Sequence, residues 1–447
     1  MGFARQGMSL ARYLTAHGAR VTVSDTRAEL PDLAEFRAMG INFELGGHPL
    51  SLLDGCNQLF LSGGVPNDTP IVLDAGRRGI RIANDAELFL ERCPTRMVVG
   101  ITGSAGKTTT TVLTQLMLAG SSLSGRVWMG GNIGNPLIEV VEQIAPDDVV
   151  VIELSSFQLE WMHTSPHIAC VTNITPNHLD RHADMAAYIA AKRNILRYQT
   201  GQDLAVLNAD DPITVRELTT NAGVARFSLR AEPDGSGAWL ADSGELRLRT
   251  STLKAPSMSD MDGVICSRGD LKLMGDHNVA NVLAASVLAA LAGASLDSIR
   301  DVATTFTGVA HRLELVREIN TVRWFNDSIA TAPERLMAGL RVFKVPVVLL
   351  VGGRDKHLPW DEAITLMARQ CRHVIFFGEL GPMVARQFAI KNPRWSLVPG
   401  LTDAIIRATE VARENDVVLL SPGGTGFDEF KDFAERGDYF KTMVRDL

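Results

Sequence analysis

Hydrophobic and polar positions along the chain repeat one arrangement three times: a short apolar run, a turn that contains glycine, and a segment whose apolar residues have helical spacing. The second and third copies begin with the apolar runs 97–102 and 345–351. The first copy begins directly at Gly2, and its helix is followed by a strand over 19–25 that ends on an acidic residue. Strands that alternate with helices predict parallel sheets with helices on both faces, so we expect an α/β fold.

The stretch between the second and third copies has a different pattern. Residues 231–273 are rich in Gly, Ser and Asp, and segments such as 245–249 alternate apolar and charged side chains, which predicts strands or hairpins. The β-rich stretch is an addition to a central domain. We expect three domains, each built on a mainly parallel, doubly wound sheet, over residues 1–94, 95–309 and 310–447.

The start of the first domain is unusual. A glycine turn of this kind normally follows a strand, but here only Met1 precedes Gly2. We expect either that the sheet of this domain forms without its first strand or that this strand is missing from the sequence.

Composition excludes several classes of protein. Of the 447 residues, 46% are hydrophobic and 21% are charged, so each domain can bury a core and the chain is not disordered. The net charge of −7 disfavours nucleic acids and anionic membranes as partners. The five cysteines are too far apart for a zinc cluster, and no apolar run is long enough to span a bilayer. Because there is no signal-peptide pattern either, we expect a cytoplasmic protein with small-molecule substrates and no membrane insertion.

The segment from Gly100 to Thr110 carries the most specific local pattern. Its glycines let backbone N–H groups turn toward phosphate oxygens, and the helix that follows presents its positive N-terminus to them. Lys107 would add a charge at the β- and γ-phosphates, and Thr108 a hydroxyl for Mg²⁺. The strict spacing of this phosphate-binding loop needs glycine at position 101, which is Ile here, so the loop is a variant. We expect it to bind a nucleotide.

A second pattern is the apolar run 149–152 followed by Glu153. A continuous apolar run predicts a central strand that is buried on both faces. Glu153 then lies at the carboxyl end of the strand, where ligands bind in open α/β sheets, and it is a candidate Mg²⁺ ligand. The alternative is an exposed acid at the end of a strand.

A third strand is expected over 170–175, and polar residues including His178 follow it. Lys192 lies in the next helix, within a segment of apolar and small residues. Taken singly, a lysine on a helix is usually solvated and a lone histidine is usually structural.

Three polar or glycine-rich turns lie in the C-terminal third. They cover residues 326–328, 352–356 and 421–427, and each follows an apolar strand. Turns at the ends of adjacent parallel strands converge on one crevice. Arg and Lys in these turns suit a ligand that carries a carboxylate.

Taken in order, these motifs resemble those of the Mur ligase family over essentially the whole chain. The segments 153–159, 178–182, 326–328 and 427–437 are most similar to the member that adds glutamate. The resemblance implies a domain for a UDP-sugar, a central ATPase domain and a domain for the amino acid. It implies a monomeric enzyme of peptidoglycan precursor synthesis that uses ATP to join glutamate to UDP-N-acetylmuramoyl-L-alanine through an acyl phosphate.

The resemblance also implies a role for each residue that matches a family motif. The catalytic residues would be Lys107, His178 and Lys192. The matches to ATP contacts are Gly103, Ser104, Ala105, Gly106, Lys107, Thr108, Thr109, Asn278, Arg312 and Asp327. On the UDP-sugar side are Arg5, Gln6, Thr26, Arg27, Ser62, Gly63, Asn132, Gln158 and His178. The amino-acid pocket would include Thr331, Lys356, Gly426 and Phe433.

Two Mg²⁺ ions and a modified lysine are implied as well. Thr108 and Glu153 would bind the first ion and His178 the second. Lys192 matches the lysine that CO₂ carbamylates in this family, which turns a cation into a carboxylate that can support the second metal ion. Carbamylation needs the neutral amine, and burial in an apolar helix face favours that form by lowering the pKa of the lysine.

The chain departs from the family pattern at a few positions. Ser104 and Ala105 replace the usual Thr/Ser-Asn pair, Ile329 stands where the glutamate ligases often carry lysine, and Gly426 stands where a serine contacts the glutamate carboxylate. The last two leave open whether D- or L-glutamate enters, with D-glutamate favoured by the motif set as a whole.

Other functions compete with this one. Gly2, Gly7 and Asp25 imitate the fingerprint of a nicotinamide-dependent dehydrogenase, but the middle glycine and the leading strand are absent from it and Lys107 would be unexplained. A nucleotide-binding protein without ligase activity is a second alternative. Another Mur-type or folylpolyglutamate-type ligase is a third.

Overall fold

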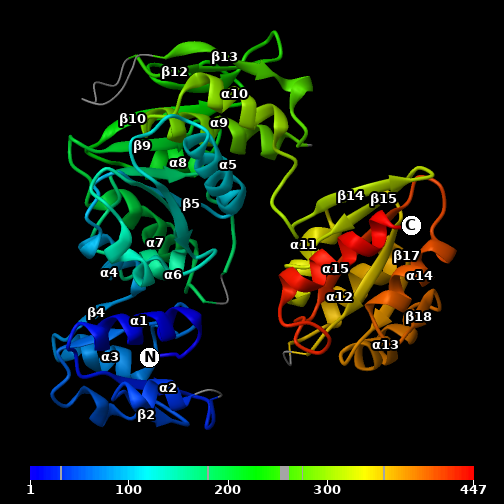
Figure 1. The fold of residues 1–447 in the computed structure, drawn as a ribbon, viewed down its shortest axis with the longest axis horizontal. Coiled ribbons are helices and arrows are strands. Elements are labelled where there is room, and N and C mark those ends of the chain that lie inside the picture. The colour runs from blue at the N-terminus through cyan, green and yellow to red at the C-terminus, as the bar shows by residue number, and fades with distance from the viewer. Residues whose placement is uncertain (31–32, 179–180, 252–260, 274, 356–357) are drawn as a thin grey trace. The chain divides into compact units, whose positions relative to one another are not determined.

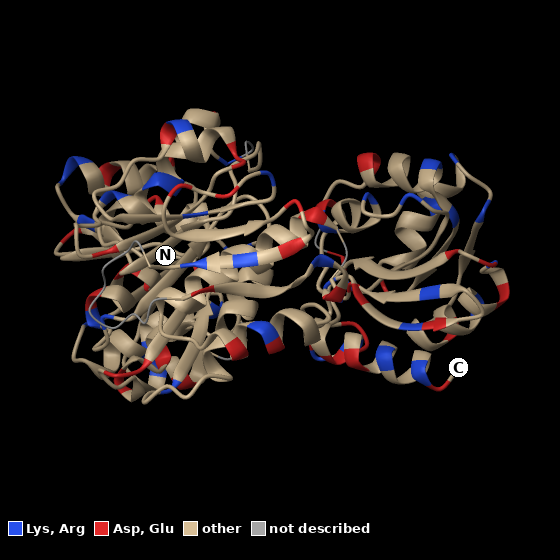
Figure 2. Cartoon of the chain, turned by 90° about the horizontal axis from the view of Figure 1, so that it is seen from above, with Lys and Arg blue, Asp and Glu red and all other residues tan. Residues whose placement is uncertain are grey.

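The computed structural model describes residues 1–447 except 31–32, 179–180, 252–260, 274 and 356–357 (Figure 1). The chain divides into two compact units, Met1–Phe306 and Thr307–Leu447. Lys356, which is predicted to bind the amino acid, lies outside the described residues. In the described ranges no helix is both long and apolar enough to cross a membrane. Figure 2 shows that positively and negatively charged residues are interspersed along the elements of both units.

The N-terminal part of the first unit has an interrupted sheet. Its elements are α1 (Arg5–Ala16), β1 (Thr22–Asp25), α2 (Leu33–Ala38), β2 (Asn42–Leu45), β3 (Gln58–Phe60), α3 (Pro70–Arg77), β4 (Arg81–Ala83) and α4 (Asp85–Arg92). Strands β1 and β2 form one parallel pair, and β3 and β4 form another. Met1 and Gly2 connect the pairs, because Gly2 N–H donates to Ser24 O (2.9 Å) and Ser62 N–H donates to Met1 O (3.0 Å). Two residues therefore occupy the place that a central strand would fill.

The rest of the first unit is built on a nine-stranded sheet in the order β13-β12-β11-β10-β9-β8-β5-β7-β6. Seven strands run parallel: β5 (Val98–Thr102), β6 (Val127–Gly131), β7 (Val149–Glu153), β8 (Ile168–Val171), β9 (Leu204–Asn208), β10 (Gly223–Ser228) and β11 (Gly237–Leu240). The antiparallel strands β12 (Glu245–Arg249) and β13 (Asp262–Ser267) come from the β-rich stretch and extend one edge. The sequence places the third strand too late, since β8 ends at Val171 and the residues after it form a loop.

Helices cover this sheet and explain its apolar strands. They are α5 (Lys107–Ala119), α6 (Ser156–Leu159), α7 (Met185–Arg197), α8 (Pro212–Glu217), α9 (Asp276–Leu291) and α10 (Leu296–Thr305). Every residue of β5, β7 and β8 is buried, as expected for parallel strands with both faces covered. The carboxyl ends of the neighbouring strands β5 and β7 carry the first two sequence motifs.

The second unit is a doubly wound sheet with one antiparallel edge strand, in the order β14-β15-β19-β16-β17-β18 (Figure 1). The strands are β14 (Glu314–Ile319), β15 (Val322–Asn326), β16 (Val347–Gly352), β17 (Cys371–Phe377), β18 (Trp395–Leu397) and β19 (Val417–Gly423). The helices are α11 (Pro333–Leu340), α12 (Asp361–Gln370), α13 (Gly381–Ala389), α14 (Leu401–Val411) and α15 (Phe433–Arg445). One apolar cluster packs α11, α12 and α13 on the sheet, and a second packs α14 and α15. This arrangement agrees with the predicted fold class.

Candidate active site

The glycine loop after β5 is held in a fixed shape. Gly106 has a φ of 83° and immediately precedes α5, and a Cβ at this position would lie 2.2 Å from Asn281 Oδ1. The Ser104 and Ala105 N–H groups donate to the backbone and side-chain oxygens of Asn173, each at 2.9 Å. The first N–H groups of a helix have no partner within the helix, so this loop can accept a phosphate at the start of α5.

Lys107 folds back over the same loop. Its Nζ donates to the Gly103 carbonyl at 2.9 Å and to the Ser104 carbonyl at 3.3 Å. The ammonium group therefore lies against the backbone that is suited to a phosphate.

Thr108 and Glu153 meet at the carboxyl edge of the sheet. The Thr108 hydroxyl donates to Glu153 Oε2 at 2.7 Å, and Asn132 Nδ2 donates to Glu153 Oε1 at 2.7 Å. Glu153 is only 1% exposed, so the alternative of an exposed acid at the end of a strand is wrong. Among the described residues no three His, Cys, Asp or Glu side chains are grouped for a metal ion. Mg²⁺ is often bound by one or two carboxylates together with phosphates and water, so this hydroxyl–carboxylate pair fits it.

Lys192 lies inside the protein, next to the phosphate-binding loop. It is 1% exposed, and its Nζ donates to Gly103 O (2.9 Å) and Thr102 Oγ1 (3.3 Å). Among the described residues no carboxylate forms an ion pair with it. Burial and the nearby Lys107 lower the pKa of Lys192 well below its usual value, although Glu153 opposes this shift. The neutral amine is therefore favoured.

His178 belongs to an aromatic cluster around Phe157. The ring centroid of Phe157 lies 5.1 Å from that of His178 and 5.4 Å from that of His182, which stacks on it. The Arg181 guanidinium lies 4.9 Å from the same ring. His178 has a φ of 54°, a backbone conformation that is uncommon for residues other than glycine.

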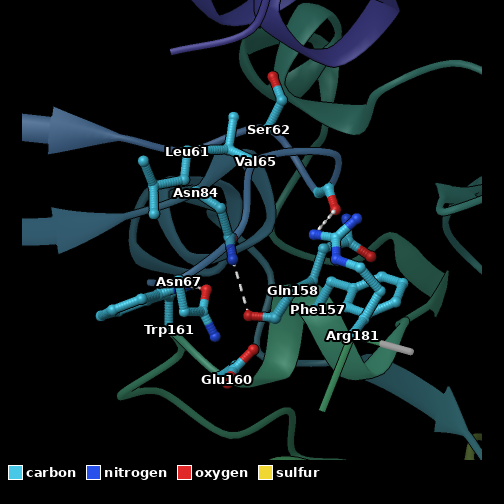
Figure 3. Close-up of a pocket in the computed structure, with 11 residues that line it drawn as sticks. Leu61, Ser62, Val65, Asn67, Asn84, Phe157, Gln158, Glu160, Trp161 and Arg181 are labelled. Carbon is cyan, nitrogen blue, oxygen red and sulfur yellow. Dashed lines mark hydrogen bonds between the residues drawn. The ribbon is translucent and has the colours of Figure 1, made fainter. Parts of the chain in front are cut away.

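Three residues predicted to bind the UDP-sugar line one pocket. Ser62 and Gly63 come from the loop after β3, and Gln158 comes from α6 (Figure 3). The other lining residues are Leu61, Val65, Asn67, Asn84, Phe157, Glu160, Trp161 and Arg181. Gln158 is 2% exposed, and its Nε2 lies near the Asp85 carboxyl but has no partner within hydrogen-bond geometry among the described residues. Gln158 thus places an amide group at the wall of this pocket, and polar groups in such positions orient a bound ligand.

Asn84, which the sequence motifs do not single out, connects the two sides of this pocket. Its Nδ2 donates to the Gln158 carbonyl at 2.7 Å (Figure 3). Its Oδ1 accepts the Glu87 N–H and thereby caps α4. The sequence contained one signal for Asn84: asparagine directly before a helix is a preferred N-cap residue.

The remaining residues predicted for the UDP-sugar lie outside that pocket. Arg5 and Gln6 begin α1, and Thr26 follows β1. The Arg27 guanidinium pairs with Asp25 at 2.8 Å, and the Asp25 carboxylate also accepts the Phe3 N–H. Hydrogen bonding with Arg27 lowers the pKa of Asp25 strongly. Asp25, the acidic residue of the dehydrogenase fingerprint, thus pairs with Arg27. Asn132 instead contacts Glu153.

The residues predicted to contact ATP are divided between the units. Asn278 lies in α9 of the first unit and accepts a hydrogen bond from Asn281. Arg312 and Asp327 belong to the second unit, where the buried Asp327 accepts Ser421 Oγ–H (2.9 Å) and the Leu313 N–H (3.2 Å). Burial raises the pKa of Asp327 to about 7.

The residues predicted for the amino acid lie on turns of the second unit. Thr331 follows the 326–328 turn, and the carbonyl of Phe433, the first residue of α15, accepts the Ser328 hydroxyl (2.8 Å). A Cβ on Gly426 would lie 2.7 Å from the Asp432 carbonyl oxygen. This close approach explains why glycine stands there instead of serine.

Arg436 is a residue of this region that the motifs did not identify. It is fully buried, and it donates from Nε to Ser328 Oγ (2.9 Å) and from Nη2 to the carbonyls of Ser328 (2.9 Å) and Gly424 (3.1 Å). The signal was the helical spacing of Phe433, Arg436 and Phe440, which puts the arginine on the inner face of α15.

Comparison with known proteins gives matches along most of the chain. Residues 1–84 match the domain described as Mur ligase MurD-like, N-terminal domain; residues 101–289 match the Mur ligase middle domain; residues 311–424 match the Mur ligase, glutamate ligase domain. The UDP-N-acetylmuramoylalanine–D-glutamate ligase of Symbiobacterium thermophilum is 41% identical, with 100% of this chain and 97% of that protein covered. The protein of the same name from Clostridium novyi is 40% identical, with 100% and 96% covered.

Solved structures share the fold. MurF from Acinetobacter baumannii superposes with a TM-score of 0.53 at 17% identity, covering 97% of this chain and 92% of that one. UDP-N-acetylmuramate-alanine ligase MurC from Thermotoga maritima gives 0.51 at 20% identity, covering 99% and 97%. The bifunctional folylpolyglutamate synthase/dihydrofolate synthase from Yersinia pestis gives 0.53 at 16% identity, covering 80% and 93%. At such low identities these matches concern the fold alone.

Proposed function

The chain belongs to the Mur ligase family, and from this premise we propose that it is an ATP-dependent, ADP-forming ligase that joins D-glutamate to UDP-N-acetylmuramoyl-L-alanine in peptidoglycan precursor synthesis. The observation that carries the proposal is the similarity to D-glutamate ligases over the entire length, at 41% identity. Similarity to the folylpolyglutamate enzyme extends only to the fold, so it does not favour the alternative of a folylpolyglutamate-type ligase.

The proposed reaction has two steps. A carboxylate oxygen of the UDP-sugar substrate attacks the γ-phosphorus of ATP, and the bond to the β-phosphate oxygen breaks, which gives an acyl phosphate and ADP. The glutamate amine then attacks the acyl carbon, loses a proton, and expels phosphate to leave an amide. In phosphoryl transfer the protein contributes mainly positioning and charge neutralisation. Lys107 supplies a cation for this purpose, and the N–H groups around Gly106 supply fixed donors.

Mg²⁺ would neutralise charge on the phosphates when it is bound. Thr108 and Glu153 are the residues proposed to hold one ion, and their direct hydrogen bond supports this pairing of a hydroxyl with a carboxylate. His178 is proposed to hold a second ion.

Lys192 is proposed to carry a carbamate. Its neutral amine would attack CO₂, form an N–C bond and release one proton, which gives the side chain a negative charge. The burial of Lys192 and its lowered pKa support the proposal, because only the neutral amine reacts.

Substrate binding follows the same assignment. We propose Arg5, Gln6, Thr26, Arg27, Ser62, Gly63, Asn132, Gln158 and His178 for the UDP-sugar. Thr331, Lys356, Gly426 and Phe433 are proposed for glutamate, and Asn278, Arg312 and Asp327 for ATP with the phosphate-binding loop. The proposal also includes domain limits near residues 94 and 309, a monomer, and a cytoplasmic location.

Phosphate release tests this function. We expect release from ATP only when UDP-N-acetylmuramoyl-L-alanine and D-glutamate are both present, with a product larger by one glutamate in mass spectrometry. Lys107→Ala should abolish release, because the loop loses its phosphate-facing cation. A strong preference for L-glutamate would overturn the choice of enantiomer. Turnover with a folate and glutamate, or normal turnover in Lys107→Ala, would contradict the assignment as a whole.

A further inference from the structure

Arg436 is a buried cation without an ion-pair partner among the described residues. It is the largest fully buried side chain among the described residues, and no carboxylate within them forms an ion pair with it. Its Nη1 has no hydrogen-bond partner in the described part of the chain. Buried charges in proteins are normally paired, because an unpaired charge loses its hydration without compensation.

Two carboxylates act electrostatically on Arg436 but do not form an ion pair with it. Asp428 and Glu429 raise the pKa of Arg436 only in part, and burial still lowers it to about 10. Glu429 Oε2 accepts the Leu401 N–H at 3.2 Å, and Asp428 Oδ2 accepts the Glu379 N–H at 3.3 Å. Arg436 therefore remains charged at neutral pH, and both carboxylates act on it without forming an ion pair among the described residues.

The guanidinium lies where three turns meet. It donates to Ser328 on the turn after β15 and to Gly424 on the turn after β19. The turn after β16 is equally near, since a Cβ on Gly353 would lie 2.7 Å from Nη1. Strands β15, β19 and β16 are neighbours in the sheet, and ligands bind at the carboxyl ends of such strands.

Peptide groups extend this contact to the third turn. The Gly424 carbonyl accepts from Arg436, and the following Thr425 N–H donates to the Arg354 carbonyl at 3.0 Å. Arg354 N–H donates back to the Thr425 carbonyl at 2.8 Å. Hydrogen bonds in series polarise one another. The positive charge of Arg436 therefore polarises the peptide groups of these turns, although the side chain itself does not reach the surface.

We propose that Arg436 is a positioning residue that makes this unit select an amino acid with a second carboxylate. It orders the three turns, and its unpaired charge favours a ligand with net charge −1 over a neutral amino acid of similar size. The inference deepens the proposed function and rests on it, because it concerns the amino acid that the ligase adds.

Two substitutions remove the charge in different ways. Arg436→Met deletes it. Ser328→Asp keeps the guanidinium but places a carboxylate beside Nε. The new carboxylate neutralises the charge of Arg436 by forming a salt bridge with it, and this salt bridge should also favour folding. For each variant the KM and kcat for D-glutamate are measured, with D-glutamine as the neutral competitor.

Both variants should raise the KM for D-glutamate by about tenfold or more. The preference for D-glutamate over D-glutamine should fall with it, and the KM for UDP-N-acetylmuramoyl-L-alanine should not change. Arg372→Met is the matched control, because Arg372 in the same unit pairs with Asp416 (2.5 Å). It should lower the melting temperature and leave the KM for glutamate unchanged.

The outcomes separate the two levels of the proposal. A wild-type chain that releases no phosphate with D-glutamate contradicts the proposed function. An active wild type together with a folded Ser328→Asp that keeps the wild-type KM and preference contradicts the role of Arg436. If Arg436→Met fails to fold, Ser328→Asp alone decides.

Discussion

Lys192 in the first unit and Arg436 in the second are both buried cations, with exposures of 1% and 0%. Each donates to the carbonyl of a glycine in a turn, Gly103 for the lysine and Gly424 for the arginine. Within the described residues neither has a carboxylate partner. The two sites differ in the chemistry of the side chain, because an ammonium group can lose its proton under these conditions and a guanidinium group cannot.

Burial therefore has opposite consequences in the two places. Burial, helped by the neighbouring Lys107, lowers the pKa of Lys192 well below its usual value, which favours the neutral amine. The pKa of Arg436 falls only to about 10, so the arginine keeps its charge. In our proposals, burial of Lys192 would favour a nucleophile for CO₂, and burial of Arg436 would favour an anionic ligand. Each change below tests whether proton loss is the property that separates the two sites.

The largest effect is expected from Lys192→Arg. An arginine at this position cannot supply a neutral amine, so we expect activity to fall about a hundredfold or more, as when groups that support a metal ligand are removed. Phosphate release measures the loss. Lys192→Ala should be equally inactive, and a short carboxylic acid should partly restore it, because the missing group is a carboxylate. Lys391→Arg, on an exposed lysine, is the control. Rescue of Lys192→Ala by a small amine would show that carbamylation is the wrong explanation.

A smaller effect, with a distinct pH dependence, is expected from Arg436→Lys. Burial lowers the pKa of a lysine, so the introduced amine is charged below its lowered pKa and neutral above it. The preference for D-glutamate over D-glutamine should therefore be kept at low pH and lost as the pH rises through that pKa. The wild type should show no such loss over pH 6.5–9, approximately, because its guanidinium stays charged there. The measurement is the ratio of kcat/KM values across that range, and a parallel profile for the two proteins would count against the comparison.

The smallest effect is expected from Tyr188→Phe. The ring lies 4.8 Å from Lys192 Nζ and is retained, whereas the hydroxyl, 2.9 Å from Ser104 Oγ, is lost. We expect the free energy of unfolding to fall by about 1 kcal/mol. Thermal denaturation measures this change. Chemical rescue of the double variant with Lys192→Ala should be as effective as that of the single variant. Weaker rescue would mean that the hydroxyl, and not burial, sets the environment of Lys192.

Much of the fold follows from the sequence because its signals are local. Apolar runs predicted β5, β7 and β15, and the glycine loop predicted that a helix follows it, which is α5. The interrupted N-terminal sheet was foreseen only as an irregularity. How Met1 and Gly2 connect its two halves depends on hydrogen bonds to Ser24 and Ser62, which lie far along the chain.

The candidate site could be predicted where a motif carries it, and the structure brings Lys107, Thr108, Glu153 and Lys192 together at neighbouring strand ends. Residues whose roles depend on neighbours in space could not be predicted from the sequence. A single arginine on a helix is usually solvated, so Arg436 gave a weak signal. The reason for glycine at position 426 is a contact in space, because the Asp432 carbonyl oxygen lies where a Cβ would have to fit.

Transfer of an oxygen isotope tests the central claim, an ATP-dependent ligase that forms an acyl phosphate, most directly. UDP-N-acetylmuramoyl-L-alanine labelled with ¹⁸O in its free carboxylate is incubated with the protein, ATP, Mg²⁺ and D-glutamate, and the phosphate and product are examined by mass spectrometry. The account predicts that each phosphate released carries one oxygen from the substrate carboxylate, in step with the addition of one glutamate. Unlabelled phosphate, or product formed without phosphate release, would contradict it.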